Sequence, residues 1–211
     1  MRRIGLTGAI AAGKSTVAER MAEAGAQVID YDKLAHDLSE PGSPAIELIR
    51  MAFGNKAITE QGALDRVWMA AHVFAANGKQ AVRSRRVLES ILHPLIYRAA
   101  SESERQILGR FGDNVVIVHD IPLLTEVYDE LPFRFDHIVT VEAPVALRVE
   151  RMMRTRGMSR AQALARIASQ TDDRWRERIS DVIIDGSTSI EQMFEQVDSL
   201  MSSWRREMEG K

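Results

Sequence analysis

Residues 8–16 read Gly-Ala-Ile-Ala-Ala-Gly-Lys-Ser-Thr and directly follow a short apolar run at residues 4–7. They match the pattern G-x-x-x-x-G-K-[ST], in which bare glycine backbone lets several N–H groups point at one anion. The helix that follows adds partial positive charge at its amino terminus. We therefore predict a loop that binds the phosphates of a nucleoside triphosphate, against the alternative of a plain glycine-rich turn with a surface lysine. The predicted binding residues are Gly8, Ala11, Ala12, Gly13, Lys14, Ser15 and Thr16, with Ser15 also a ligand of Mg²⁺.

The pattern of apolar residues around this loop predicts an α/β fold. Short apolar runs recur at 3–7, 26–29, 115–119, 137–141 and 181–184, with longer helical patterns between them. Such alternation is typical of a parallel sheet flanked by helices, here with five strands. The first helix is expected to begin near Lys14 and to end at Gly25, because glycine is common just past a helix end.

Strand signals vanish between the second and third apolar runs. That stretch is predicted to be a helical insert, with helices interrupted at Gly54, at Asn77-Gly78 and at Pro94. We expect one domain over residues 1–211 with three sub-regions. These are a core at 1–42, 113–143 and 179–211, an insert at 43–112 and an arginine-rich lid at 144–178.

Composition narrows the classes of partner. The chain has 211 residues, a net charge of −2 and no cysteine. The balanced charge gives no broad electrostatic case for binding nucleic acid or a membrane surface. The absence of cysteine excludes disulfides and thiolate chemistry and suits a reducing compartment. Because no long apolar stretch opens the chain, we expect a cytoplasmic protein without a signal peptide or membrane span. We also expect a monomer that binds neither nucleic acid nor membrane.

Two carboxylates follow the second apolar run. Asp30 and Asp32 are two residues apart, and strand carboxyl ends face the ligand crevice in open α/β sheets. Either residue could accept a proton from an attacking hydroxyl. The alternative is that one of them caps the next helix. A GTP-specific switch is excluded because the nearest match to a guanine-reading Asn-Lys-x-Asp, residues 55–58, lacks the aspartate.

Every basic residue between 148 and 178 is an arginine. The planar guanidinium suits phosphate oxygens, so this block predicts a closing segment that neutralises the transferring phosphoryl group. A solvated helix face and an RNA-binding patch are the alternatives, and the latter is weakened by the lack of interleaved aromatic residues. The arginines are at positions 148, 151, 154, 156, 160, 166, 174, 176 and 178.

Taken in order, these motifs resemble the dephospho-coenzyme A kinase family nearly end to end. That family transfers the γ-phosphoryl group of ATP to the 3′-hydroxyl of dephospho-CoA, so the resemblance implies ATP, Mg²⁺ and dephospho-CoA as ligands. The matching stretches are 4–16, 28–32 with Ala35 and His36, 41–42, 63–66, 92–96, 120–124 with Glu126, 165–170 and 180–185.

The resemblance also assigns roles to residues of this chain. It implies that Asp32 is the catalytic base, that Arg151 is the leading lid arginine, and that the insert receives the coenzyme A moiety. The predicted catalytic residues are Lys14, Asp32 and Arg151. Four further residues are predicted substrate contacts: His93, Asp120, Leu123 and Arg156. For His93 the alternative is a packing role just before a helix that begins at Pro94, and for Asp120 it is a cap on the following turn.

Three positions depart from the family pattern. Thr155 stands where a second lid arginine is usual, so we expect the next residue, Arg156, to make the second lid contact. Arg148 replaces a common glutamine, and Gly186 replaces a common asparagine near the expected adenine site. The residues alone also allow two other functions: a P-loop kinase for another hydroxylated metabolite, and a nucleotide-sensing module without transfer activity.

Overall fold

The computed structural model describes residues 1–73, 78–170 and 173–210. These form two compact units, one made of Met1–Asp30 with Glu104–Lys211 and the other of Tyr31–Ser103. The first unit contains the whole sheet, and the second is helical. The sub-regions expected from the sequence divide at 43 and 112, whereas the contacts divide the chain at 31 and 104, so the functional boundaries remain a prediction.

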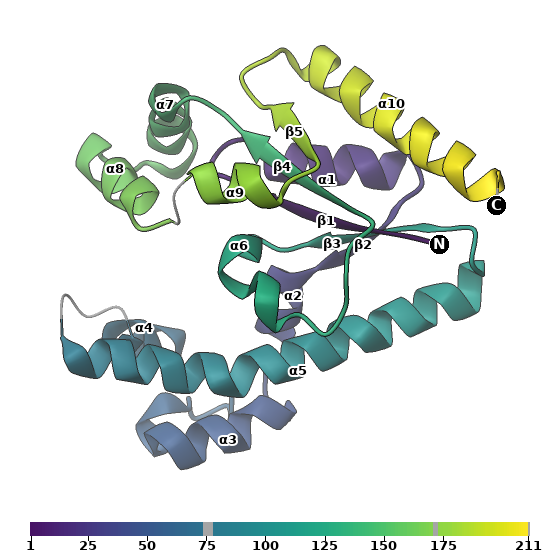
Figure 1. The fold of residues 1–211 in the computed structure, drawn as a ribbon. Coiled ribbons are helices and arrows are strands. Elements are labelled where there is room, and N and C mark those ends of the chain that lie inside the picture. The colour runs from purple at the N-terminus through teal and green to yellow at the C-terminus, as the bar shows by residue number, and fades with distance from the viewer. Residues whose placement is uncertain (74–77, 171–172, 211) are drawn as a thin grey trace. The chain divides into compact units, whose positions relative to one another are not determined.

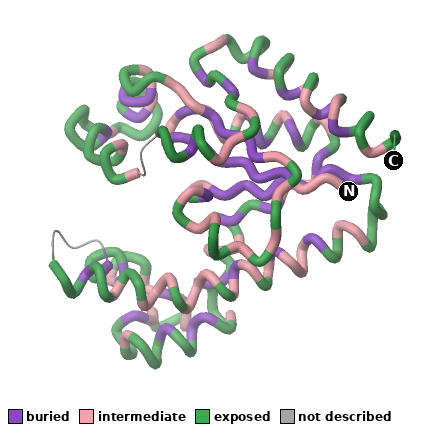
Figure 2. The backbone as a smooth tube through the Cα atoms, viewed as in Figure 1, coloured by how far each residue is buried: buried purple, intermediate pink, exposed green. Residues whose placement is uncertain are grey.

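The first unit is built on a five-stranded parallel sheet with the order β2-β3-β1-β4-β5 (Figure 1). All five strands form where apolar runs predicted them, and no strand end differs from the predicted one by more than one residue. They are β1 Arg2–Gly8, β2 Gln27–Asp30, β3 Val116–Asp120, β4 His137–Glu142 and β5 Val182–Asp185. Valine and isoleucine make up half or more of β2, β3, β4 and β5, because β-branched side chains fit a pleated, buried surface. Figure 2 shows the buried backbone running along these strands.

Strand register brings the chemically interesting residues to one edge. Leu6 of β1 lies opposite Asp120 of β3, and Gly8 lies opposite Val141 of β4. Asp30 of β2 also lies opposite Asp120. Because parallel strands all end on the same side of the sheet, the phosphate loop after β1 and the acidic ends of β2 and β3 share that edge.

Helices cover both faces of the sheet. Alternating strand residues point to opposite faces. Ile4 and Leu6 pack with helices α1 Lys14–Glu23 and α10 Ile190–Glu209, which lie side by side in Figure 1. Gly5 faces the other way, toward Leu124 in α6 Leu124–Val127 and Phe135. Helix α9 Asp173–Ile179 lies on the same face, where it contacts β4 and α6. The short 3-10 helix η2 Tyr128–Glu130 follows α6 and contacts it.

The arginine-rich segment folds into two further helices of this unit. They are α7 Val145–Arg156 and α8 Arg160–Ala168, and they pack on each other around Val149, Met152 and Ala163. Ser159 and Gln162 form a capping box at the start of α8. Within the described ranges, no helix is both long and apolar enough to cross a membrane.

The second unit consists of helices, as the absence of strand signals predicted. They are α2 Tyr31–Asp37, α3 Pro44–Phe53, the short η1 Asn55–Ala57, α4 Arg66–Val73 and the part of α5 Lys79–Phe111 up to residue 103. The break at Gly54 is confirmed, because α3 ends there with a glycine at positive φ. Asn77, part of another expected break, lies outside the described residues.

The expected break at Pro94 is wrong, because the proline lies inside α5. A proline removes one backbone hydrogen bond and costs about 3 kcal/mol in a helix interior. Here the helix is held by buried residues on both sides, Ala81 before the proline and Ile96 and Ala100 after it, while the proline ring is exposed. Tertiary packing therefore outweighs the local preference, and His93 sits in mid-helix rather than before a helix start.

A buried charge network fixes the end of α5 to the sheet within the first unit. Glu104 accepts hydrogen bonds from Arg3 of β1, one of them at 2.9 Å, and lies 3.1 Å from Nε2 of the fully buried His119 of β3. Burial raises the pKa of Glu104, but the hydrogen bonds from His119 and Arg3 outweigh it and lower this pKa to about 2. Burial lowers the pKa of His119, against the opposing effect of Glu104. The network therefore holds an ionised carboxylate beside a neutral imidazole.

Replacing Glu104 with glutamine should destabilise the fold by about 2 kcal/mol at neutral pH, because Arg3 loses its charged acceptor. The pKa of this carboxyl is lower in the fold than its ordinary value of 4.5, so its contribution is complete above about pH 4.5 and is lost as the pH falls toward 2. Urea unfolding of the wild type and of Glu104→Gln at pH 5 and pH 3 measures the difference between their free energies of unfolding. This difference should be smaller at pH 3 than at pH 5. Glu195→Gln, at an exposed position, is the control. An equal difference in the free energy of unfolding at both pH values would contradict the lowered pKa of Glu104.

Candidate active site

The phosphate loop connects β1 to α1 by a tight turn. The Ala9 amide donates to Val141 O at 3.0 Å, and the Ala12 amide donates to Ala9 O at 3.0 Å. Ala11 between them has φ of 60°, and among the described residues it is the one non-glycine position with positive φ. The loop ends at Gly13, the N-cap of α1. The predicted strand–loop–helix context of the motif is therefore confirmed.

The loop lysine meets a carboxylate from the neighbouring strand. Lys14 Nζ donates to Asp120 Oδ1, and both side chains are largely buried. The ammonium group and the carboxylate thus lie together at the carboxyl edge of the sheet, beside the start of α1. This contact brings together two residues that the sequence suggested separately. A lysine that can exchange this carboxylate for phosphate oxygens suits phosphate binding.

Arg151 of α7 reaches the loop directly. Its Nη1 donates to the carbonyls of Ala11 at 3.2 Å and Ala12 at 2.9 Å, and its Nη2 donates to Gly186 O at 2.7 Å. The predicted leading lid arginine therefore lies against the phosphate loop. Its three acceptors are neutral carbonyls, and an anionic phosphate oxygen would bind a guanidinium more strongly than any of them.

Gly186 lies after β5, where the backbone comes very close to the loop. A Cβ on this glycine would sit 1.9 Å from Ala12 O and 3.2 Å from Glu142 O. No side chain fits at that distance, so the departure from the family asparagine matches a local backbone arrangement that only glycine allows. The same carbonyl group of Ala12 is bonded by Arg151, so Gly186 and Arg151 together fix the end of the loop.

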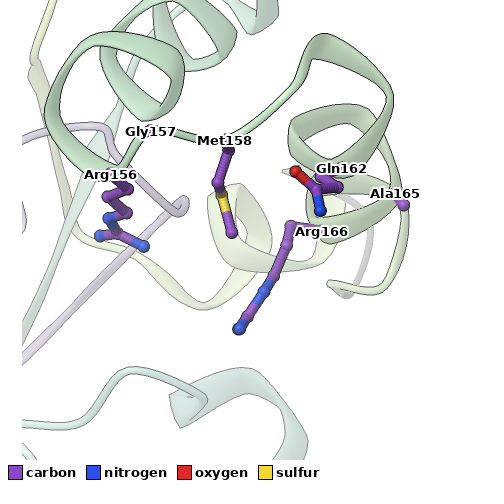
Figure 3. A pocket seen from close by; sticks show the side chains of 6 residues that line it. All are labelled: Arg156, Gly157, Met158, Gln162, Ala165 and Arg166. Atoms are coloured by element: carbon purple, nitrogen blue, oxygen red, sulfur yellow. The ribbon is translucent and has the colours of Figure 1, made fainter.

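The arginines of the block have different environments. Arg148 is fully buried, and Arg176 of α9 is 3% exposed and donates to Glu142 at 2.6 Å from its Nε. These two side chains are part of the protein interior. Arg156, in contrast, lines an open hollow of about 510 Å³ between α7 and α8, where its side chain and that of Arg166 both extend (Figure 3). The hollow is lined by Arg156, Gly157, Met158, Gln162, Ala165 and Arg166.

The remaining predicted residues divide between the two units. Leu123 is exposed and directly precedes α6 in the first unit. Asp32 and His93 belong to the second unit. Asp32 is exposed in the first turn of α2, and the ring of His93 is tilted against that of Tyr97 with centroids 5.8 Å apart. Asp30 is the last residue of β2, so Asp32 follows the carboxyl edge of the sheet by two residues along the chain. Its catalytic role stays a prediction.

Two contacts at the site are not predicted by the sequence patterns. Gln170 accepts a hydrogen bond from the Ile10 amide at 2.8 Å, and Glu142 forms the ion pair with Arg176. Gln170 ends the 165–170 stretch, which matches the family without a role of its own. Glu142 is the last residue of β4. Its position at the carboxyl end of a strand is the sequence feature that could have indicated a place in the site.

The donor set fits a magnesium ion held mainly by substrate. Among the described residues, no three His, Asp or Glu side chains cluster as a metal site. Mg²⁺ is typically bound by one or two protein ligands together with phosphate oxygens and water. Ser15 in the first turn of α1, and Asp120 beside Lys14, provide the hydroxyl and carboxylate groups that such an arrangement needs.

Comparison with known proteins agrees with this geometry. The family model described as dephospho-CoA kinase matches residues 2–192. A Bifidobacterium longum protein named dephospho-CoA kinase is 48% identical over 204 residues, which cover 97% of each chain.

Two solved structures extend the match to the fold. The protein TT1252 from Thermus thermophilus superposes with a TM-score of 0.78 at 28% identity, over 96% of this chain and 97% of the other. Dephospho-CoA kinase from Campylobacter jejuni gives a TM-score of 0.59 at 25% identity, over 96% of both chains. The chain belongs to the dephospho-CoA kinase family.

Proposed function

We infer that this chain is an ATP-dependent kinase that phosphorylates the ribose 3′-hydroxyl of dephospho-CoA and yields coenzyme A and ADP. The observation that carries this function is the family match over residues 2–192, together with relatives of that name along nearly the whole chain. The phosphate loop, with Lys14 beside Asp120, supplies the nucleotide-binding chemistry that such a reaction needs. The reaction is the last step of coenzyme A biosynthesis.

We propose that the loop amides and Lys14 hold the β- and γ-phosphates of ATP. Lys14 then leaves Asp120 for the phosphates, and the carboxylate of Asp120 orients water molecules near the nucleotide. Ser15 and Asp120 are the residues that would hold Mg²⁺ in this arrangement. When bound, the ion neutralises charge on the phosphate oxygens. In-line phosphoryl transfer depends mostly on such positioning and charge stabilisation.

The acceptor is activated, in our proposal, by Asp32, which takes the proton of the ribose 3′-hydroxyl as it attacks. Its place two residues after the end of β2 supports this role, because ligands bind at strand carboxyl ends in open α/β sheets. The helical insert receives the coenzyme A moiety, with His93 in α5 as a contact. Leu123, just before α6, is a further contact to the acceptor.

Arg151 is proposed to stabilise the charge that spreads over the transferring phosphoryl group. Its contact with the carbonyls of Ala11 and Ala12 already places it beside the loop. Arg156, exposed on the hollow between α7 and α8, is proposed as the second lid contact. The lid itself, residues 144–178, closes over the nucleotide and excludes water. We further propose that the protein is a cytoplasmic monomer without nucleic-acid partners.

Product identification tests the function directly. The protein is incubated with ATP, Mg²⁺ and dephospho-CoA, and the products are identified by mass spectrometry and by their phosphorylation site. Coenzyme A phosphorylated at the 3′ position and ADP are expected, with product lost when EDTA removes Mg²⁺. A panel of nucleosides and sugar acids tested as acceptors distinguishes a dephospho-CoA kinase from a kinase for another metabolite. Dephospho-CoA should give a far higher kcat/KM than any of them. ATP binding without any phosphorylated acceptor would contradict the function and favour a sensing module.

Replacing Asp32 with asparagine should lower kcat about 100-fold or more, because a general base typically contributes a factor of 10² to 10⁴. ATP affinity should stay near that of the wild type, since the loop is intact. Asp30→Asn, two residues earlier, is the matched control and should retain most of the turnover. Steady-state kinetics with both substrates varied and calorimetric titration with ATP measure the two effects. Unchanged turnover in Asp32→Asn would remove this residue from the mechanism.

A further inference from the structure

The crest of the phosphate loop, residues 10–12, is held by side chains from the arginine-rich segment. The Ile10 amide donates to Gln170 Oε1 at 2.8 Å, just after the end of α8. Arg151 of α7 donates to the carbonyls of Ala11 and Ala12. Three successive residues of the loop are thus bonded to side chains rather than only to neighbouring backbone.

Apolar packing adds to these bonds. Ile10 and Ala11 lie against the cluster formed by Val149, Met152 and Ala163 between α7 and α8. Burial of this apolar surface favours contact between the loop crest and these helices. It does not, however, determine how the individual peptide groups of the loop are oriented, because hydrophobic contact is non-directional.

The bond from Gln170 does determine the orientation of one peptide group. In a trans peptide the N–H of Ile10 and the C=O of Ala9 point in opposite directions. Gln170 holds that N–H, and Ala9 O on the other side accepts from the Ala12 amide at 3.0 Å. Gln170 therefore supports the hydrogen bond that closes the turn from Ala9 to Ala12.

This turn is one that its sequence disfavours. Ala11, its third residue, has φ of 60°, a conformation suited to glycine or asparagine and unfavourable for alanine. A local preference would open the turn. Contacts from outside the loop hold it closed: the directional hydrogen bonds from Gln170 and Arg151, and the apolar packing of Ala11 against the cluster between α7 and α8.

We propose that Gln170 is a positioning residue for nucleotide binding: by fixing the peptide group between Ala9 and Ile10, it keeps the phosphate loop in the shape that receives ATP. The inference rests on the proposed function, because it names a residue that prepares the same site. Gln170 acts through the loop backbone. Its effect therefore falls on ATP affinity rather than on the affinity for the acceptor or on the chemical step.

Gln170→Met tests this proposal, because methionine keeps the length of the side chain and removes the strong acceptor. Calorimetric titration of the full chain with Mg·ATP should show affinity weakened about fivefold, the effect of one lost hydrogen bond. KM for dephospho-CoA and kcat should change less than twofold. Gln192→Met is the matched control, since the Gln192 side-chain oxygen accepts from the Ser189 amide within the cap of α10. It should lower the melting temperature slightly and leave ATP affinity unchanged.

Equal ATP affinity in wild type and Gln170→Met would overturn the inference while leaving the kinase assignment intact. A wild type that fails to bind ATP would instead overturn the proposed function, and the two failures are therefore distinguishable. Hydrogen exchange at the Ile10 amide provides a second test that needs no folded variant. In the nucleotide-free wild type this amide should exchange more slowly than a solvent-exposed amide, and exchange at the exposed rate would contradict the bond to Gln170.

Discussion

Close backbone packing at both ends of the phosphate loop is the constraint on which the site depends. A Cβ on Gly8 would lie 2.6 Å from Val141 O, and one on Gly186 would lie 1.9 Å from Ala12 O. Between these two contacts the chain turns within a few residues, and Ala11 has positive φ. The strands β1, β4 and β5 therefore limit the path of the chain at both ends of the loop, while Gln170 and Arg151 hold the residues between those ends.

The chemistry of the site follows from this constraint. The turn directs the chain into α1, so Lys14 comes to lie beside Asp120 at the end of β3. Arg151 uses the carbonyls of the same turn as acceptors, which joins the arginine-rich helices to the loop. A nucleotide arriving at this edge would meet a lysine, an arginine and a helix amino terminus already placed. Such preorganisation suits phosphoryl transfer, in which positioning and charge stabilisation provide most of the catalysis.

Sequence patterns predicted the parts of the fold that depend on local chemistry. The apolar β-branched runs indicated all five strands, and the glycine pattern indicated the loop together with Lys14 and Ser15. The break expected at Pro94 was wrong because packing on both sides of the proline holds α5 together. Arg151 could not be separated by chemistry from Arg148 and Arg176, since only burial and partners distinguish identical side chains. Gln170 carried no charge or periodicity signal, and its bond to Ile10 depends on tertiary structure.

The ATP affinity of Gly8→Ala tests most directly whether close packing at Gly8 shapes the phosphate loop. It is determined by calorimetric titration alongside Gly109→Ala. Gly109 lies in the last part of α5, and, apart from its chain neighbours and the backbone of its own helix, no atom of the described residues lies within 4 Å of the position that an alanine methyl group would take there. Its replacement should therefore leave ATP affinity unchanged and slightly stabilise the helix. In Gly8→Ala the new methyl group meets Val141 O, and the start of the loop has to move. We expect this variant to fold and to bind ATP at least about tenfold more weakly than the wild type. Wild-type ATP affinity in a folded Gly8→Ala protein would contradict this expectation.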